Sequence, residues 1–95
     1  MFKHLASFNN MSIFDAVQQH DISAIHTIIS HGKHLSLDSQ NRTALFYATS
    51  LDVADILIEN GVDIDHKDTH GYTALIYAKT QLSMRHVQLY LQEFQ

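Results

Sequence analysis

The sequence repeats itself at an interval of 30 residues. The hexapeptide that begins at Thr43, Thr-Ala-Leu-Phe-Tyr-Ala, returns at Thr73 as Thr-Ala-Leu-Ile-Tyr-Ala. A repeat of this length in a chain of 95 residues predicts a stack of small units, because one such unit cannot bury its apolar face alone. The repeat therefore favours a binding function over a catalytic one.

Small residues and glycines give the number of units. Ala16, Ala48 and Ala78 occupy corresponding places in three first helices, and Gly32 and Gly61 each follow a second helix. A glycine there permits the left-handed conformation that ends many helices, so we expect a positive φ at Gly61. We treat the chain as a single domain with four segments: an N-terminal cap 1–11, unit one 12–42, unit two 43–72, and unit three with a C-terminal cap 73–95.

Apolar spacing predicts the buried faces. Ser12 and Asp15 form a capping-box-like pair at the start of the first helix. Helical spacing then predicts an apolar stripe of Ile22, Ile25, Ile28 and Ile29, and a second of Leu51, Ala54, Leu57 and Ile58. Asp52, Asp55 and Glu59 should face solvent. Leu57 and Leu75 should be central core residues.

The combined pattern resembles the ankyrin repeat. Residues 61–65, Gly-Val-Asp-Ile-Asp, and 68–73, Asp-Thr-His-Gly-Tyr-Thr, match the loop motif of that family almost position for position. Residues 38–43 match with Asn41 in the glycine position, and Asn tolerates positive φ. The resemblance covers about residues 11–95. It implies an all-α, ankyrin-like stack of helix–turn–helix repeats, a solenoid with short β-hairpin loops.

The sequence departs from the family pattern in three respects. Thr-Pro becomes Thr-Ala at both hexapeptides, and the histidine of the motif is replaced by Phe46 and Ile76. The second unit is also about three residues shorter between its helices, which should tighten that turn. None of these changes alters the expected fold.

Composition excludes several classes of function. The net charge of −4 does not suit a protein that binds nucleic acid, and no apolar run approaches the roughly 18 residues that cross a membrane. The first ten residues lack a continuous apolar segment, so we expect no secretory signal. With no Cys, the chain has neither a disulfide framework nor thiolate metal ligands. We expect a soluble, cytoplasmic protein.

Neither the histidines nor the carboxylates predict chemistry. Of the eight histidines, the pairs His31/His34 and His66/His70 are candidate metal ligands, but no third ligand has zinc-like spacing. We predict solvated surface histidines and no metal or other cofactor. The acidic helix face lacks the desolvated setting of acid–base catalysis, and no phosphate loop or nucleophile motif occurs. We predict that the protein is not an enzyme.

The resemblance also implies a partner-binding surface. In ankyrin-like stacks the hairpins project from the helices and, with the inner face of the first helices, form a concave binding surface. By position in the motif, that surface comprises Gln40, Arg42, Thr49, Ser50, His66, Lys67, Thr69, His70, Tyr72, Lys79 and Thr80. We expect Arg42 and Tyr72 to point into solvent and to matter for binding more than for stability. The alternative is that a hairpin tip is polar only because it is exposed.

The terminal helix is a second candidate surface. Val87, Tyr90, Leu91 and Phe94 can pack on the preceding repeat, but Met84, His86 and Leu89 are harder to bury. At the other end Phe2, Leu5 and Phe8 could cap the first unit. The alternative to inward-packed caps is a surface for a partner or for a second copy, the latter a homodimer through Met84, Leu89 and Phe94.

These observations lead to one preferred function and two rivals. The preferred function is a non-enzymatic module that occupies a surface of one protein partner. The chain resembles small bacterial or phage ankyrin-like proteins, so an inhibitor or immunity factor is one form of that function. The rivals are a structural subunit that self-associates through its C-terminal helix, and a sensor that responds to pH or metal through its histidines.

Overall fold

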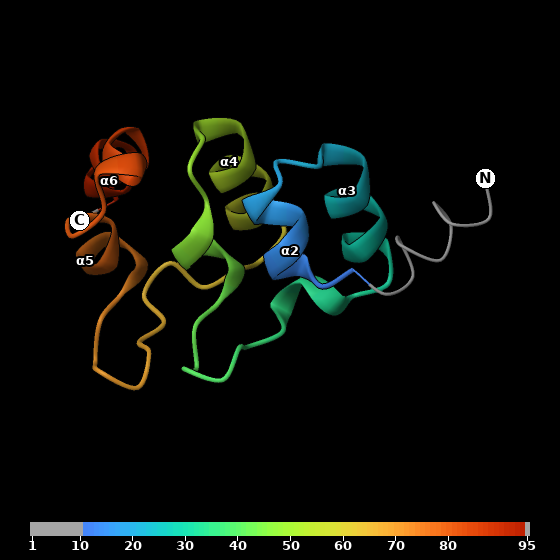
Figure 1. Ribbon diagram of the computed structural model, residues 1–95, viewed down its shortest axis with the longest axis horizontal. Helices are drawn as coiled ribbons and strands as arrows, with labels where there is room; N and C mark the ends of the chain where they lie inside the picture. Colours follow the sequence, from blue (N-terminus) through green and yellow to red (C-terminus); the bar gives the residue numbers. More distant parts are fainter. Residues whose placement is uncertain (1–10, 95) are drawn as a thin grey trace.

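Three pairs of short helices follow one another along the chain in the computed structural model, which describes residues 11–94 (Figure 1). The pairs are α2 (Ile13–Gln18) with α3 (Ile22–Ser30), the 3₁₀ helix η2 (Ala44–Tyr47) with α4 (Leu51–Glu59), and α5 (Ala74–Ala78) with α6 (Arg85–Gln92). Two further 3₁₀ helices, η1 (Lys33–Leu35) and η3 (Leu82–Met84), follow α3 and α5. No strand occurs between residues 11 and 94, so the expected all-α stack is confirmed. The proposed N-terminal cap with Phe2, Leu5 and Phe8 lies outside the described residues.

The core contains an alanine at the corresponding position of each unit. Ala16, Ala48 and Ala78 are all fully buried, and an alanine at that place lets the neighbouring helix pack closely. Leu57 and Leu75 are buried as the sequence predicts. The core therefore continues from one pair of helices to the next.

N-cap side chains stabilise the start of the first helix in units one and three. The Ser12 hydroxyl accepts a hydrogen bond from the Asp15 N–H at 3.1 Å, and the Thr73 hydroxyl accepts one from the Ile76 N–H at 3.3 Å. The N-cap residue of η2, Thr43, makes no such bond, and its buried hydroxyl has no partner among the described residues. Of the three first helices, only that of the second unit therefore lacks a side-chain hydrogen bond at its N-cap.

The first helix of the second unit differs from those of its neighbours, because the turn that follows it is shorter. The segment that begins at Thr43 forms a four-residue 3₁₀ helix rather than an α-helix. The chain leaves this helix at Ala48, whose φ of −71° and ψ of 125° are extended. Because only three residues separate Tyr47 from Leu51, there is no room for another helical turn before α4.

The register of α4 corrects part of the predicted core. Val53, Ala54 and Leu57 are its buried residues, whereas Leu51 is exposed and Ile58 is half-buried. Leu51, the first residue of the helix, is 44% exposed. Asp55 does not simply face solvent, since its carboxylate accepts a hydrogen bond from the hydroxyl of Tyr90 on α6.

The expected left-handed positions are present. Gly61 has a φ of +96° after α4, and Asn41 has a φ of +62° in the glycine position of the first loop. Both residues are therefore in a conformation that most side chains disfavour.

Candidate protein-binding surface

Two long loops project to the same side of the helices and are built by the same turn (Figure 1). Asp38 Oδ1 accepts hydrogen bonds from the N–H groups of Gln40 and Arg42, both at 2.9 Å. Asp68 Oδ1, one repeat later, accepts from His70 N–H at 2.8 Å and Tyr72 N–H at 2.9 Å. One aspartate therefore folds each hairpin loop and fixes where the following side chains emerge.

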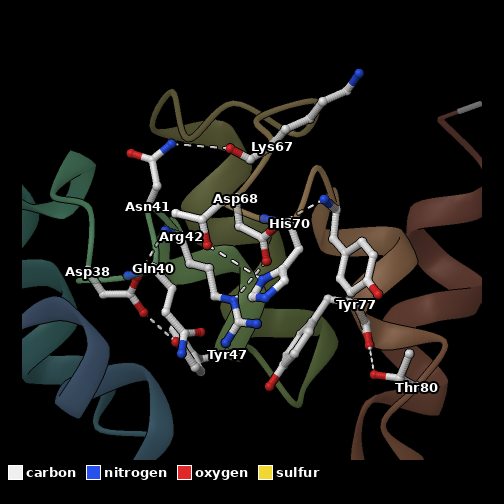
Figure 2. A network of polar contacts seen from close by, with 12 residues as sticks. Asp38, Gln40, Asn41, Arg42, Tyr47, Lys67, Asp68, His70, Tyr77 and Thr80 are labelled. Carbon is white, nitrogen blue, oxygen red and sulfur yellow. Dashed lines mark hydrogen bonds and ion pairs between the residues drawn. The ribbon is translucent and has the colours of Figure 1, made fainter.

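The two loops are also bonded to each other. The Thr69 N–H donates to the carbonyl of Gln40 at 3.0 Å. His66 Nε2 donates to the carbonyl of Asn41 at 2.7 Å, and Asn41 Nδ2 donates to the carbonyl of Lys67 at 3.3 Å. These contacts join adjacent repeats at their tips, so the tips form one surface rather than two independent loops (Figure 2).

Arg42 holds the loops together instead of pointing into solvent. Its Nε donates to Asp68 Oδ2 at 3.0 Å, and its guanidinium carbon lies 4.4 Å from the centre of the Tyr77 ring. The side chain of Arg42 is only 13% exposed and that of Asp68 is 0% exposed. The expectation that Arg42 points into solvent is therefore wrong, because unit two supplies an anion for it, Asp68, and unit three supplies an aromatic face, Tyr77.

The surroundings of the two aspartates stabilise their charged forms. Burial alone would raise the pKa of Asp68, but backbone N–H groups of its own turn and the Arg42 guanidinium lower it below 3.8. Burial likewise opposes ionisation of Asp38, whereas the Tyr47 hydroxyl and the backbone N–H groups of its turn lower its pKa. Both carboxylates are thus structural anions at neutral pH.

Five polar or aromatic side chains remain available at the tips. Tyr72 is 41% exposed, and its ring lies 5.8 Å from that of His70 at an angle of 31°. The exposed residues, which we call the hairpin-tip surface, are Gln40, Lys67, Thr69, His70 and Tyr72. His66, half-buried and bonded to the neighbouring loop, supports this surface from below.

A hollow lies beside the first helices, at the expected inner face. Its volume is about 180 Å³, and we call it the first-helix groove; its lining residues include Gln18, Tyr47, Thr49, Tyr77, Gln81 and Ser83. The rings of Tyr47 and Tyr77 are 6.4 Å apart, and that of Phe14 lies 5.9 Å from Tyr47. The sequence interpretation missed these tyrosines, although each is the fifth residue of the repeated hexapeptide.

The predicted residues at the ends of the first helices are less uniform. Thr49 and Lys79 are exposed, with Thr49 on the groove. The Ser50 hydroxyl is occupied by Asp52 at 2.5 Å, and the Thr80 hydroxyl donates to the carbonyl of Tyr77 at 2.7 Å. The hydroxyls of Ser50 and Thr80 are therefore used in hydrogen bonds to nearby residues of their own unit.

The two histidines around the first glycine turn, His31 and His34, are each bonded to a backbone carbonyl. His31 Nδ1 donates to the carbonyl of Thr27 at 2.8 Å, and His34 Nε2 donates to that of Asn60 at 2.8 Å. His34 is buried, which corrects the expectation that the histidines are all solvated. Within residues 11–94 no three His, Asp or Glu side chains are grouped so as to hold a metal ion.

The terminal helix does not present the apolar surface that a homodimer was expected to use. Met84 is buried, so it is not available to a second copy. Phe94 packs edge-on against Tyr90, with ring centres 5.3 Å apart, whereas Leu89 lines a different hollow. The three residues therefore do not share one face.

Comparison with known proteins agrees with the architecture. The family model for ankyrin repeats matches residues 13–91 in three copies. No curated protein has a significantly similar sequence. In the part of the chain that the structure describes, no helix has the length and apolarity needed to cross a membrane.

Proposed function

Since the chain belongs to the ankyrin-repeat family, we propose that it is a non-enzymatic module that binds one protein partner through its hairpin-tip surface and first-helix groove. Ankyrin repeats generally mediate protein–protein interaction. The finer assignment, to this surface of this chain, depends on one observation. An exposed Tyr72 is stacked near His70 at a tip whose backbone is fixed by Asp68.

A rigid tip favours binding for a thermodynamic reason. Association costs conformational freedom at the interface, and Tyr contributes a large contact area with few rotatable bonds. The turn around Asp68 and the bonds between the two loops order the backbone before any partner arrives. Tyr72 can therefore act as an anchor, with Gln40, Lys67 and Thr69 as adaptable polar contacts around it.

The adjacent groove extends the same surface. Its lining combines the aromatic rings of Tyr47 and Tyr77 with uncharged polar side chains such as those of Gln18, Thr49 and Gln81. An uncharged, partly aromatic hollow suits an apolar side chain of the partner. We propose that the partner places one such side chain in the groove while its backbone passes the hairpin tips.

The test is affinity capture from the native host followed by mass spectrometry. The full-length protein is compared with Tyr72→Ala and with the matched control Leu35→Ala, which removes an exposed apolar side chain from η1. A protein retained by the wild type and the control but lost with Tyr72→Ala supports the proposal. Equal retention by all three proteins contradicts the assignment to the hairpin tips.

The consequence of binding is also a proposal. We propose a small inhibitor or immunity-type protein that masks its target in the cytoplasm, a compartment that suits a sequence without Cys. Once the partner is captured, its activity is measured with and without the wild-type protein and with Tyr72→Ala. Loss of partner activity only with the wild type supports inhibition, whereas unchanged activity in a stable complex supports a scaffold.

Self-association is the alternative, and the structure weakens it. Without Met84, a homodimer through the terminal helix would depend on Leu89 and Phe94, which face different surroundings. Size-exclusion chromatography with light scattering decides between the two. A stable dimer that Leu89→Ser dissociates would favour the structural subunit.

A further inference from the structure

A second hollow lies at the C-terminal end of the stack. Its volume is about 310 Å³, and it is enclosed by the loop after α5 and by one side of α6. We call it the terminal hollow; the residues that characterise it are Lys79, Gln81, Leu82, Arg85, Gln88 and Leu89. Gln81 also lines the first-helix groove, so the two hollows are neighbours.

Exposed leucines distinguish this site from ordinary surface. Leu82 is 91% exposed and Leu89 is 55% exposed, and both border the same hollow. Arg85 and Leu89 are four residues apart on α6 and so lie on one helix face. A leucine as exposed as Leu82 leaves apolar area in water that a partner could cover, and apolar groups gathered beside polar ones mark interaction sites.

The charged side chains around these leucines are all positive. Lys79 and Arg85 both line the hollow, and no Asp or Glu does. The ion pairs of residues 11–94 are His20–Asp52 and Arg42–Asp68, so neither Lys79 nor Arg85 is paired within that range. The chain as a whole carries six basic and ten acidic residues, which makes two unpaired cations in one hollow a local reversal of its net charge.

We infer that the terminal hollow binds an acidic, amphipathic segment of a partner protein, with an apolar side chain between Leu82 and Leu89 and carboxylates near Lys79 and Arg85. Complementary charge gives such a segment specificity and faster association, and burial of the leucines gives affinity. Gln81 and Gln88 supply neutral donors and acceptors to its backbone. This site goes beyond the hairpin-tip surface and does not require it.

A second copy of this chain is a poorer occupant. A homodimer related by a two-fold axis would bring Lys79 and Arg85 of one copy close to the same residues of the other. Like charges at such an interface are unfavourable unless an anion lies between them. An acidic segment of another protein meets no such repulsion.

The experiment is a selection from a random twelve-residue peptide library displayed on phage. The full-length wild type is the bait, and the bound peptides are tested individually by fluorescence anisotropy. We expect enriched peptides to be net negative with one or two large apolar residues. Their affinity should fall at least tenfold with Arg85→Glu and with Leu82→Ser, and it should weaken as salt rises.

Matched controls separate this site from general effects. Lys33→Glu makes the same charge reversal on η1, and Leu35→Ser removes a comparable exposed leucine. Both should leave peptide affinity unchanged, as should Tyr72→Ala. Circular dichroism checks that each variant is folded.

Three results would overturn the inference. They are enrichment of neutral or basic peptides, no enriched peptide that responds to Arg85→Glu or Leu82→Ser, and a concentration-dependent dimer that Leu89→Ser dissociates. If the selected peptides respond only to Tyr72→Ala, the terminal hollow is rejected while the proposed function stands. The reverse pattern is the expected one: it supports the hollow and leaves the hairpin-tip surface to its own test by affinity capture.

Discussion

Replacing Arg42 by alanine should destabilise the fold, because its side chain, at the end of unit one, contacts both of the units that follow. The substitution removes the hydrogen bond to Asp68 Oδ2 at 3.0 Å and the stacking on Tyr77 at 4.4 Å. A hydrogen bond to a charged group is worth about 1.5–3 kcal/mol, and a cation–π contact about 0.5–1 kcal/mol. We therefore expect Arg42→Ala to lower the free energy of unfolding by about 2–4 kcal/mol.

That loss is large for a short stack. A small domain has a total stability of about 5–15 kcal/mol, and each kcal/mol moves the Tm of a domain this size by about 4–8 °C. Urea denaturation followed by circular dichroism at 222 nm measures the difference directly. Arg42→Lys should recover only part of the loss, because an ammonium group retains the charge without the planar stacking surface.

The matched control is Lys67→Ala in the neighbouring loop. Lys67 is exposed, and its contact with Asn41 uses its backbone carbonyl, so this substitution should change stability by less than about 0.5 kcal/mol. A double substitution of Arg42→Ala with Asp68→Asn should cost less than the two single effects together. If Arg42→Ala is as stable as Lys67→Ala, the guanidinium is solvated and the reasoning fails.

Four further predictions concern other parts of the molecule. Leu57→Ala should cost about 2–5 kcal/mol in urea denaturation, and an unchanged Tm would mean that the core register is wrong. At Gly61 an added Cβ would have no atom within 4 Å, so the cost of Gly61→Ala should come only from the φ of +96° and amount to about 1–3 kcal/mol of unfolding free energy, with Gly61→Val losing more. Equal stability of the wild type and both variants would contradict this. Hydrogen bonding to Asp55, with burial, raises the pKa of Tyr90 to about 12, so Asp55→Asn should lower the highest tyrosine pKa in an absorbance titration at alkaline pH. Because the pKa of Asp68 is lower in the folded state, its contribution to stability is complete above the unfolded carboxyl pKa near 3.8 and is lost as the pH falls through the folded value; Asp68→Asn should flatten this acid decline in melting experiments.

The architecture could be predicted because local pattern and tertiary packing agree. The buried alanines at 16, 48 and 78 keep one packing environment in each unit, so their spacing alone indicates the stack. Asn41 also behaves as its position in the motif predicts. The type of the first helix in the second unit was not predicted: its short turn leaves η2 no room to continue as an α-helix.

The binding surface was harder to predict because equivalent positions have different neighbours. Arg42 and Tyr72 occupy the same place in successive loops, yet Arg42 is followed by a loop that offers Asp68. Tyr72 belongs to the second of the two hairpin loops, which no further hairpin loop follows within the described residues, and it is exposed. A repeat pattern gives the position of a side chain, but the next unit decides whether that side chain is free.

The start of the terminal helix explains why its surface was predicted wrongly. Met84 and Leu89 were expected to be hard to bury against the preceding repeat, and with Phe94 they made the predicted homodimer surface. In the structure Met84 precedes α6 at the end of η3 and turns into the core. Spacing alone could not show where the helix begins, and a shift of one residue rotates every later side chain by about 100°.

The central claim is that this stack binds its partner through the hairpin tips and the adjacent groove. Hydrogen–deuterium exchange of the captured complex tests it most directly, because every backbone N–H reports its own protection. We predict slower exchange on binding at residues 40–42, 66–72 and 77–81, with little change in α3. Protection confined to the outer helices α3 and α4, with unchanged exchange in both hairpin loops, would contradict the account.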